Sequence, residues 1–254
     1  PGGGLPRACQ RISAEQWDRL DPDNAIAWLH VATSARSRGD GAAEADALQH
    51  LASARESRPY GDRLPDIALS LLPSDASPLE RLQVMAALFG TFATWSFPQY
   101  QSVTRYCSVE AVRDANRRQS CDAIASTLVA HGSTLTDLDI GKLIGARAGW
   151  PDEKVDAITS ELDAARAIQA RILLTGDQTY GCGSVVQFRN YLGRVAQRGE
   201  LGAARLAIQE SGETTVDLAR EYQVVLKKWM REAQARDAAA QAAVDAASAA
   251  SSGS

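Results

Sequence analysis

The pattern of hydrophobic and polar positions predicts helices along almost the whole chain. Apolar residues recur every three or four positions between proline and glycine breaks, and no segment shows the strict alternation of a half-buried strand. The longest such stretch runs from about Asp152 to Leu174, after a break at Gly149-Trp150-Pro151. The pattern therefore predicts an all-α fold of about ten helices, stacked as antiparallel hairpins in the manner of an α-solenoid.

Turn residues and caps set the expected helix limits. Helices are expected at about 5–20, 25–38, 42–57, 79–95, 121–131, 133–147, 152–174, 184–197, 201–211 and 215–233, with a short apolar segment at 64–72. The helix over 79–95 is so apolar that we expect it to be the most buried, and 96–106, which contains Pro98, is expected to be a connection. These elements form one expected domain over 1–232, with a possible subdivision near 96–106.

The last stretch, 233–254, is expected to be an Ala/Ser-rich tail. Its first part can continue the preceding helix, and its end from about Ala249 has nothing to bury, so we expect it to fray. The chain starts at Pro1, so the lack of a signal peptide in this sequence says nothing about export.

Composition supports helix and excludes some functional classes. Alanine accounts for 45 of the 254 residues and aromatic residues for 6%, a balance that favours helix over sheet. The net charge of −4 argues against a general nucleic-acid binder, which needs a basic face. No apolar run approaches the roughly 18 residues of a membrane span, so none is expected.

The four cysteines are Cys9, Cys107, Cys121 and Cys182. None forms a CxxC pair or has a histidine at metal-ligand spacing, so neither a structural zinc site nor any other metal site is expected. Their even number fits a protein with disulfides in an oxidising compartment, whereas the alternative is four buried thiols in a cytosolic protein.

The expected bonds are Cys107–Cys121 and Cys9–Cys182. One continuous helix would hold Cys107 and Cys121 about 20 Å apart, too far for a disulfide, but Asp114-Ala115-Asn116 is a plausible helix break that lets the two ends fold back. The pairing of Cys9 with Cys182 follows by elimination.

Two segments resemble the helix pairs of tetratricopeptide repeats. Trp28 stands at the aromatic position of the first helix and Gly39-Asp40 follows at the family's spacing, although Glu44 occupies the small-residue position of the second helix. Phe188 and Gly199-Glu200 repeat the pattern, but Leu192 replaces a small residue there. The resemblance covers only part of the chain and implies a degenerate stack of helical hairpins. More loosely, the chain resembles Ala/Arg-rich secreted proteins of high-GC proteobacteria, which implies a location in the cell envelope and no activity.

Sequence motifs for catalysis are absent. There is no HExxH, no GxSxG and no phosphate-binding GxxxxGK[ST]. The run Gly181-Cys182-Gly183-Ser184 leads into a helix and could hold an anion, but a structural turn around a disulfide is the preferred interpretation. No catalytic residue and no cofactor site are therefore expected.

Charged residues supply the remaining candidates. Arg113, Arg117 and Arg118 form a basic cluster that could contact phosphate or an acidic partner, or that could be a solvated helix face. Lys227-Lys228-Trp229-Met230-Arg231 is a second basic segment, too small for a nucleic-acid surface. The carboxylates that a glycosidase would need are Glu80, Glu110, Asp137, Asp139, Glu153 and Glu161, and the sequence does not bring any two together.

These observations favour a non-enzymatic interaction protein of the bacterial periplasm or cell surface. It would bind a protein or peptide in the groove of stacked hairpins, for instance as an immunity or inhibitor protein for a secreted toxin. One alternative is a cell-wall hydrolase whose carboxylate site is not visible in the sequence. Another is a cytosolic helical adaptor.

Overall fold

The chain is all-α in its computed structural model, as the periodicity predicted. The structure describes residues 13–77, 79–81, 83–84, 87–88, 100–174 and 182–252, without the side chains of 62, 65, 66, 173, 174, 182–185, 188 and 243–252. This part of the chain contains no strand, only two isolated bridges, Asn24–Glu56 and Ser57–Gly132. None of its helices is long and apolar enough to cross a membrane.

The helices of the described part of the chain have the following bounds: α1 Ala14–Leu20, α2 Ala25–Ser37, α3 Gly41–Ala52, α4 Leu64–Ser70, α6 Tyr100–Tyr106, α7 Ala115–His131, α8 Leu135–Ala148, α9 Asp152–Leu174, α10 Cys182–Ser211 and α11 Thr215–Ser252. Short 3₁₀ turns, η2 Gly61–Arg63 and η3 Ala111–Arg113, precede α4 and α7. The expected break between 184–197 and 201–211 is present, because Gly199 within α10 has φ 74° and ψ 168°.

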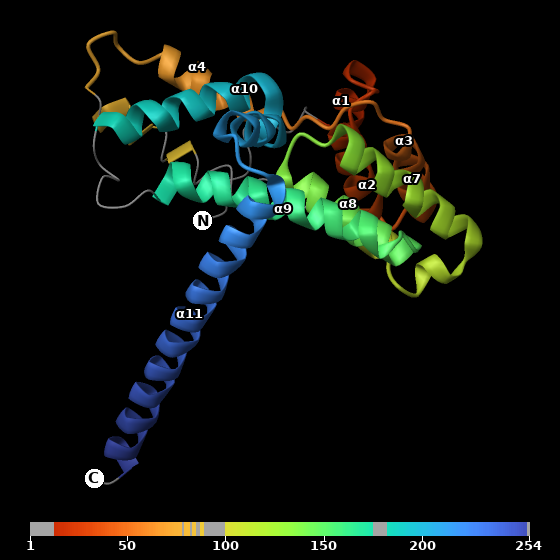
Figure 1. Ribbon diagram of the computed structural model, residues 1–254. Helices are drawn as coiled ribbons and strands as arrows, with labels where there is room; N and C mark the ends of the chain where they lie inside the picture. The colour runs from red at the N-terminus through yellow and green to blue at the C-terminus, as the bar shows by residue number, and fades with distance from the viewer. Residues whose placement is uncertain are drawn as a thin grey trace, which may run out of the picture.

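The helices stack as hairpins around a long central helix. Helix α2 packs against α3 and α7 against α8, and α3 contacts α7 (Figure 1). Helix α9 packs against α8, α10 and α11 (Figure 1). Beyond its contact with α9, helix α11 projects away from the other helices (Figure 1). This arrangement agrees with the expected stack of antiparallel hairpins.

Among the residues that the structure describes, the core forms three apolar clusters in sequence along the stack. The first joins α2, α3, α6 and α7 through residues such as Leu29, Leu48 and Ile124. The second joins α8, α9 and the second half of α10, and the third joins α9 to α11. Trp150 packs against the first two clusters and Ile208 against the last two, so the apolar interior is continuous from α2 to α11.

Three predicted helix limits are wrong. Helix α7 begins at Ala115, not near 121, because Asp114 caps it. Helix α1 begins at Ala14, not near residue 5, because Ser13 and Gln16 form a reciprocal capping box that starts the helix there. Helix α3 ends at Ala52, not near 57. The next residues run beside the start of α2, where Ala25 donates its N–H to the Glu56 carbonyl at 2.7 Å. Arg55 and Glu56 also donate their N–H groups to the Asp23 carbonyl at 2.9 and 3.1 Å, and a longer helix would need these two donors.

Two further expectations differ from the structure. The supposed connection 96–106 contains helix α6, so Pro98 precedes a helix. In the predicted most-buried helix, Leu79 is 62% exposed and no described position of 79–88 is buried, while the others lie outside the described residues. Helix α11 continues to Ser252, and the expected fraying from about Ala249 stays a prediction. Alanine is the residue that best sustains a helix without packing.

The disulfide Cys107–Cys121 is present as predicted, with its Cα atoms 5.7 Å apart. The break is also where expected, since Asp114 caps α7 by accepting a hydrogen bond from the Arg117 N–H at 2.8 Å. Both half-cystines are fully buried in the first apolar cluster. The other predicted bond, Cys9–Cys182, lies outside the described residues and stays a prediction.

Removing this disulfide should destabilise the protein measurably. We expect the double variant C107S/C121S to lose about 3 kcal/mol of unfolding free energy, because its unfolded chain regains the freedom of a short closed loop. Urea denaturation of both proteins measures the loss. Intact mass after alkylation without reductant confirms that the bond is closed in the parent. A midpoint unchanged within error would show that the loop is already ordered without the bond.

Candidate functional site

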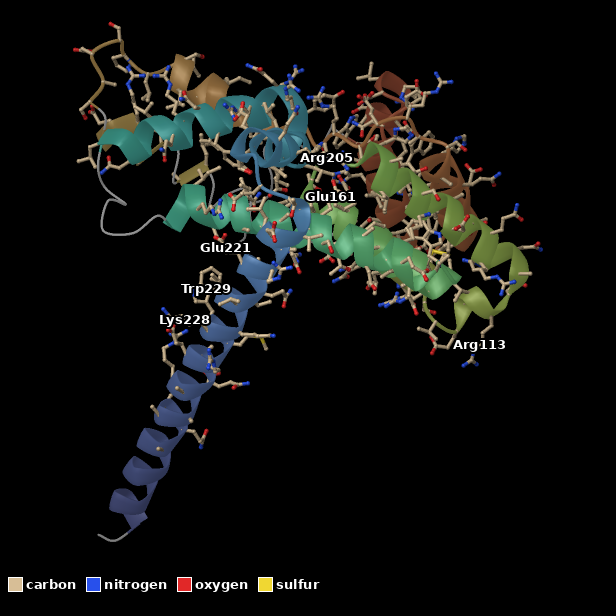
Figure 2. All side chains as sticks on the ribbon, in the orientation of Figure 1. Arg113, Glu161, Arg205, Glu221, Lys228 and Trp229 are labelled. Carbon is tan, nitrogen blue, oxygen red and sulfur yellow. A yellow bond between two sulfur atoms is a disulfide. The ribbon has the colours of Figure 1, made fainter. Side chains whose placement is uncertain are left out.

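The predicted basic cluster is divided by the fold. Arg113 and Arg118 are exposed, and Arg113 projects from the outer end of the molecule (Figure 2). Arg117 is half-buried and lines a cavity instead. The sequence therefore located one of the residues of this cavity, which we call the arginine pocket.

The arginine pocket lies where four helices meet beside the disulfide. It has a volume of about 280 Å³, and its walls come from segments far apart in the sequence. The lining residues are Arg36 of α2, Gly39 of the following turn, Gly41 and Glu44 of α3, Arg105 and Tyr106 of α6 and Arg117 of α7.

The backbone of the α2–α3 turn shapes one wall of the pocket. Gly39 has φ 73°, a left-handed conformation that favours glycine, and it ends α2. Asp40 then starts α3 by accepting a hydrogen bond from the Ala43 N–H at 3.0 Å. A side chain added at Gly39 or Gly41 would meet no atom within 4 Å, so this wall faces open space.

The disulfide positions the opposite wall. Arg105 and Tyr106 immediately precede Cys107, and Arg117 lies one helical turn before Cys121 on α7. Arg147 of α8 also holds the end of α6, donating hydrogen bonds to the carbonyls of Thr104 and Cys107 at 3.1 and 3.2 Å. The bond between α6 and α7 therefore fixes the distance between their pocket residues.

Positive charge dominates the arginine pocket. Arg36 pairs with the Glu44 carboxylate at 3.6 Å, and both side chains are largely buried, at 27% and 18% exposure. The Arg117 guanidinium lies over the Tyr106 ring, 3.7 Å from its centroid. Among the described residues, neither Arg105 nor Arg117 forms an ion pair, so two cations of the pocket lack an anionic partner within this part of the chain.

This arrangement suits the binding of an anion. Guanidinium groups donate hydrogen bonds to carboxylate or phosphate oxygens in pairs, and they stay charged throughout the physiological pH range. Stacking on Tyr106 fixes the plane of Arg117 while its N–H groups remain able to donate. The start of α3 adds the positive end of a helix dipole to the same wall.

The carboxylates considered for hydrolysis occupy structural positions. Glu80 accepts hydrogen bonds from Ser77, and Glu161 binds Arg205 across α9 and α10 (Figure 2). Asp139 pairs with Lys142 and Arg166. Glu110 and Glu153 are exposed. None of these five lines the arginine pocket.

Asp137, the sixth, is the centre of a buried polar junction. Its Oδ1 accepts hydrogen bonds from the Tyr100 hydroxyl at 2.6 Å and the Ser57 hydroxyl at 3.1 Å. Its Oδ2 accepts from the N–H groups of Ser133 and Thr134 at 3.0 and 3.1 Å. The carboxylate thus ties the α3–α4 connection and α6 to the start of α8.

The protonation of this junction is set by its burial. Burial raises the pKa of Asp137, while the hydrogen bonds from Tyr100, Thr134 and Ser57 lower it. Burial and the neighbouring carboxylate also raise the pKa of Tyr100 well above 10. The Tyr100 hydroxyl therefore stays protonated and donates a hydrogen bond to the Asp137 carboxylate. This arrangement holds the helices together.

Neither the histidines His30 and His50 nor Cys182 is among the residues that line the pocket. His30 contacts Trp17 in a tilted arrangement, with 5.1 Å between ring centroids, and His50 stacks on Trp28 with 4.2 Å between centroids, so each histidine contacts a different tryptophan. Cys182 begins α10, and the side chains of 182–184 and all of Gly181 lie outside the described residues. In the part of the chain that the structure describes, no group of three potential ligands for a metal ion comes together.

The sequence did not indicate Arg36 and Arg105 as site residues, because only the fold brings α2 and α6 beside α7. Glu44 offered one signal, since it stands where the tetratricopeptide pattern has a small residue, and in the structure it pairs with Arg36 in the pocket. No protein-family model, curated protein or solved structure matches this chain, so its function is argued from this geometry.

Proposed function

We propose that the chain is a non-enzymatic binding module that captures a protein partner by an acidic segment. The observation that carries the proposal is the arginine pocket, with its two cations that lack an anionic partner among the described residues. A carboxylate of the partner, from Asp, Glu or a chain end, would accept paired hydrogen bonds from Arg105 and Arg117. Tyr106 would pack against its aliphatic part.

The chemistry of the pocket supports binding in preference to catalysis. Guanidinium groups hold an anion but do not give up their proton near neutral pH, and the pocket's one carboxylate, Glu44, is paired with Arg36. An acidic protein segment fits the charge and the open wall at Gly39 and Gly41. An immunity or inhibitor protein is one role that such a module could fill.

The proposed location is a bacterial periplasm or cell surface. The buried disulfide Cys107–Cys121 supports it, because such bonds persist in oxidising compartments and are rare in the cytosol. The same bond fixes α6 against α7, so the proposed binding site would form fully only where the bond is stable.

A labelled acidic peptide tests the proposal. We expect fluorescein-labelled hexaglutamate to bind the full chain, and R105E/R117E to weaken binding at least about tenfold because two attractive charges become repulsive. Fluorescence anisotropy at low and raised salt measures the affinity, which should fall with salt.

The matched control is R113E/R118E, which makes the same change of charge at the two exposed arginines of the cluster. It should leave binding within about twofold, since neither side chain lines the pocket and exposed charges are screened by salt. Equal losses for both variants would refute a defined pocket and indicate only a general charge effect. Tighter binding of inorganic phosphate than of the peptide would refute the protein partner.

A further inference from the structure

Helix α11 leaves its packing partner partway along its length. Leu218 and Ala219 are buried against α9, but beyond Leu226 every described residue up to Ala242 is exposed except Ala233, which is half-buried. At about 1.5 Å per residue, the 24 residues from Trp229 to Ser252 extend about 36 Å from the body. Figure 1 shows this part of α11 projecting alone.

An apolar groove marks the place where α11 separates from α9. It has a volume of about 260 Å³ and is lined by Ala167, Ala170 and Arg171 of α9 and by Glu221, Tyr222, Val225 and Trp229 of α11. Arg171 is held by ion pairs with Glu213 and Glu221, so its charge is already neutralised. Figure 2 shows Glu221 and Trp229 on the same side of α11 at this point.

Large apolar side chains are exposed around the groove. Trp229 is 39% exposed and Met230 54% exposed. Burial of a tryptophan is among the largest single contributions to protein association, and the floor of Ala167 and Ala170 leaves room beside it. Because Trp229 projects partly into solvent, a partner helix with small side chains can approach it closely and bury it.

The far half of α11 has the matching pattern. A heptad face runs through Tyr222, Leu226 and Trp229 and then, at the same spacing of three and four residues, through Ala233, Arg236 and Ala240. The sequence continues this face with alanine at 243, 247 and 250. One face of a single helix thus has bulky residues near the body and almost only alanine farther out.

Charge is divided in the same way. The part of α11 near the body, residues 222–232, carries the basic residues Lys227, Lys228 and Arg231 and one acidic residue, Glu232. The far part, residues 233–252, carries one basic residue, Arg236, and two acidic residues, Asp237 and Asp245. An antiparallel pair of these helices sets the basic part of one copy beside the acidic part of the other, whereas a parallel pair sets like charges together.

We propose that α11 is a dimerisation helix that pairs antiparallel with α11 of a second copy of this chain. The alanine face of each copy covers Trp229 and the groove of the other, so the same contact occurs twice around a two-fold axis. A second copy is the occupant because both complementary halves, in size and in charge, lie on this one helix. The proposal is independent of the arginine pocket, which is formed by other helices.

Sedimentation equilibrium of the full chain tests the proposal. We expect a concentration-dependent mass that approaches twice the chain's 27.1 kDa. W229A should weaken the dimer at least about tenfold, because the tryptophan is lost from both halves of the contact. The control V224A removes an apolar side chain that is 65% exposed on the opposite side of the same helix, and it should leave the mass curve unchanged.

A charge exchange tests the orientation. K227E/K228E/R231E alone and D237K/D245K alone should each lose association, and an equimolar mixture of the two variants should recover it. Circular dichroism checks that every variant keeps its helix content. A monomer at all concentrations, equal effects of W229A and V224A, or single charge variants that associate like the parent would each overturn the antiparallel dimer.

Discussion

Replacing Asp137 with alanine should lower the free energy of unfolding by about 4 kcal/mol. The variant removes the only carboxylate of the buried junction and leaves four donors without an acceptor, the hydroxyls of Tyr100 and Ser57 and the N–H groups of Ser133 and Thr134. Asp137 is 0% exposed, so water does not readily replace the lost oxygens. Urea denaturation followed by circular dichroism measures the change.

The control for this variant lies two residues farther along α8. Asp139 pairs with Lys142 and Arg166, and its side chain is 44% exposed, so D139A should cost less than about 1 kcal/mol. D137N keeps one acceptor oxygen and should fall between the two. If D137A and D139A had the same effect, the junction would not be the main link between α6 and α8.

Replacing Gly199 with alanine should have a comparable effect, also about 4 kcal/mol. With φ 74° and ψ 168°, this residue has a conformation that is essentially restricted to glycine. A Cβ atom there would lie 2.7 Å from the Ser133 Cβ and 2.8 Å from the Ser133 carbonyl oxygen. That carbonyl accepts the Leu201 N–H at 2.9 Å, so Ser133 cannot move away without breaking the contact.

Gly193, in the same helix, supplies the control. It lies in the regular helical part of α10, and a Cβ added there would meet no atom within 4 Å. G193A should therefore be neutral or stabilise the protein by up to about 1 kcal/mol, because alanine favours helix. The expected result is thermal midpoints that move in opposite directions. A G199A protein as stable as the parent would contradict the strain at this turn.

Local signals explain which elements the sequence predicted correctly. Helix α9 was predicted with both ends correct, because Pro151 precedes it and its apolar spacing is regular. The Cys107–Cys121 bond followed from two cysteines on either side of a capping residue, Asp114. Helix α6 was missed because Pro98 is an ambiguous signal. Proline is common both in connections and just before a helix.

Tertiary contacts explain what the sequence could not predict. The arginine pocket joins Arg36, Arg105 and Arg117 from three helices, and no spacing rule connects them. Asp137 is different, because Thr134 and Asp137 form a capping box whose spacing is visible in the sequence. That pattern places the carboxylate at a helix start, but only the fold brings Tyr100 and Ser57 to it.

The Asp137 junction also bears on the order in which the chain folds. Hairpins such as α2–α3 and the loop closed by Cys107–Cys121 join residues that are near in sequence, so little entropy is lost in forming them. The junction instead gathers Ser57, Tyr100 and Asp137, with the Gly199 turn against Ser133 beside it. Contacts across such long separations slow folding. We therefore expect the junction to form after the separate hairpins and to join them into one cooperative structure.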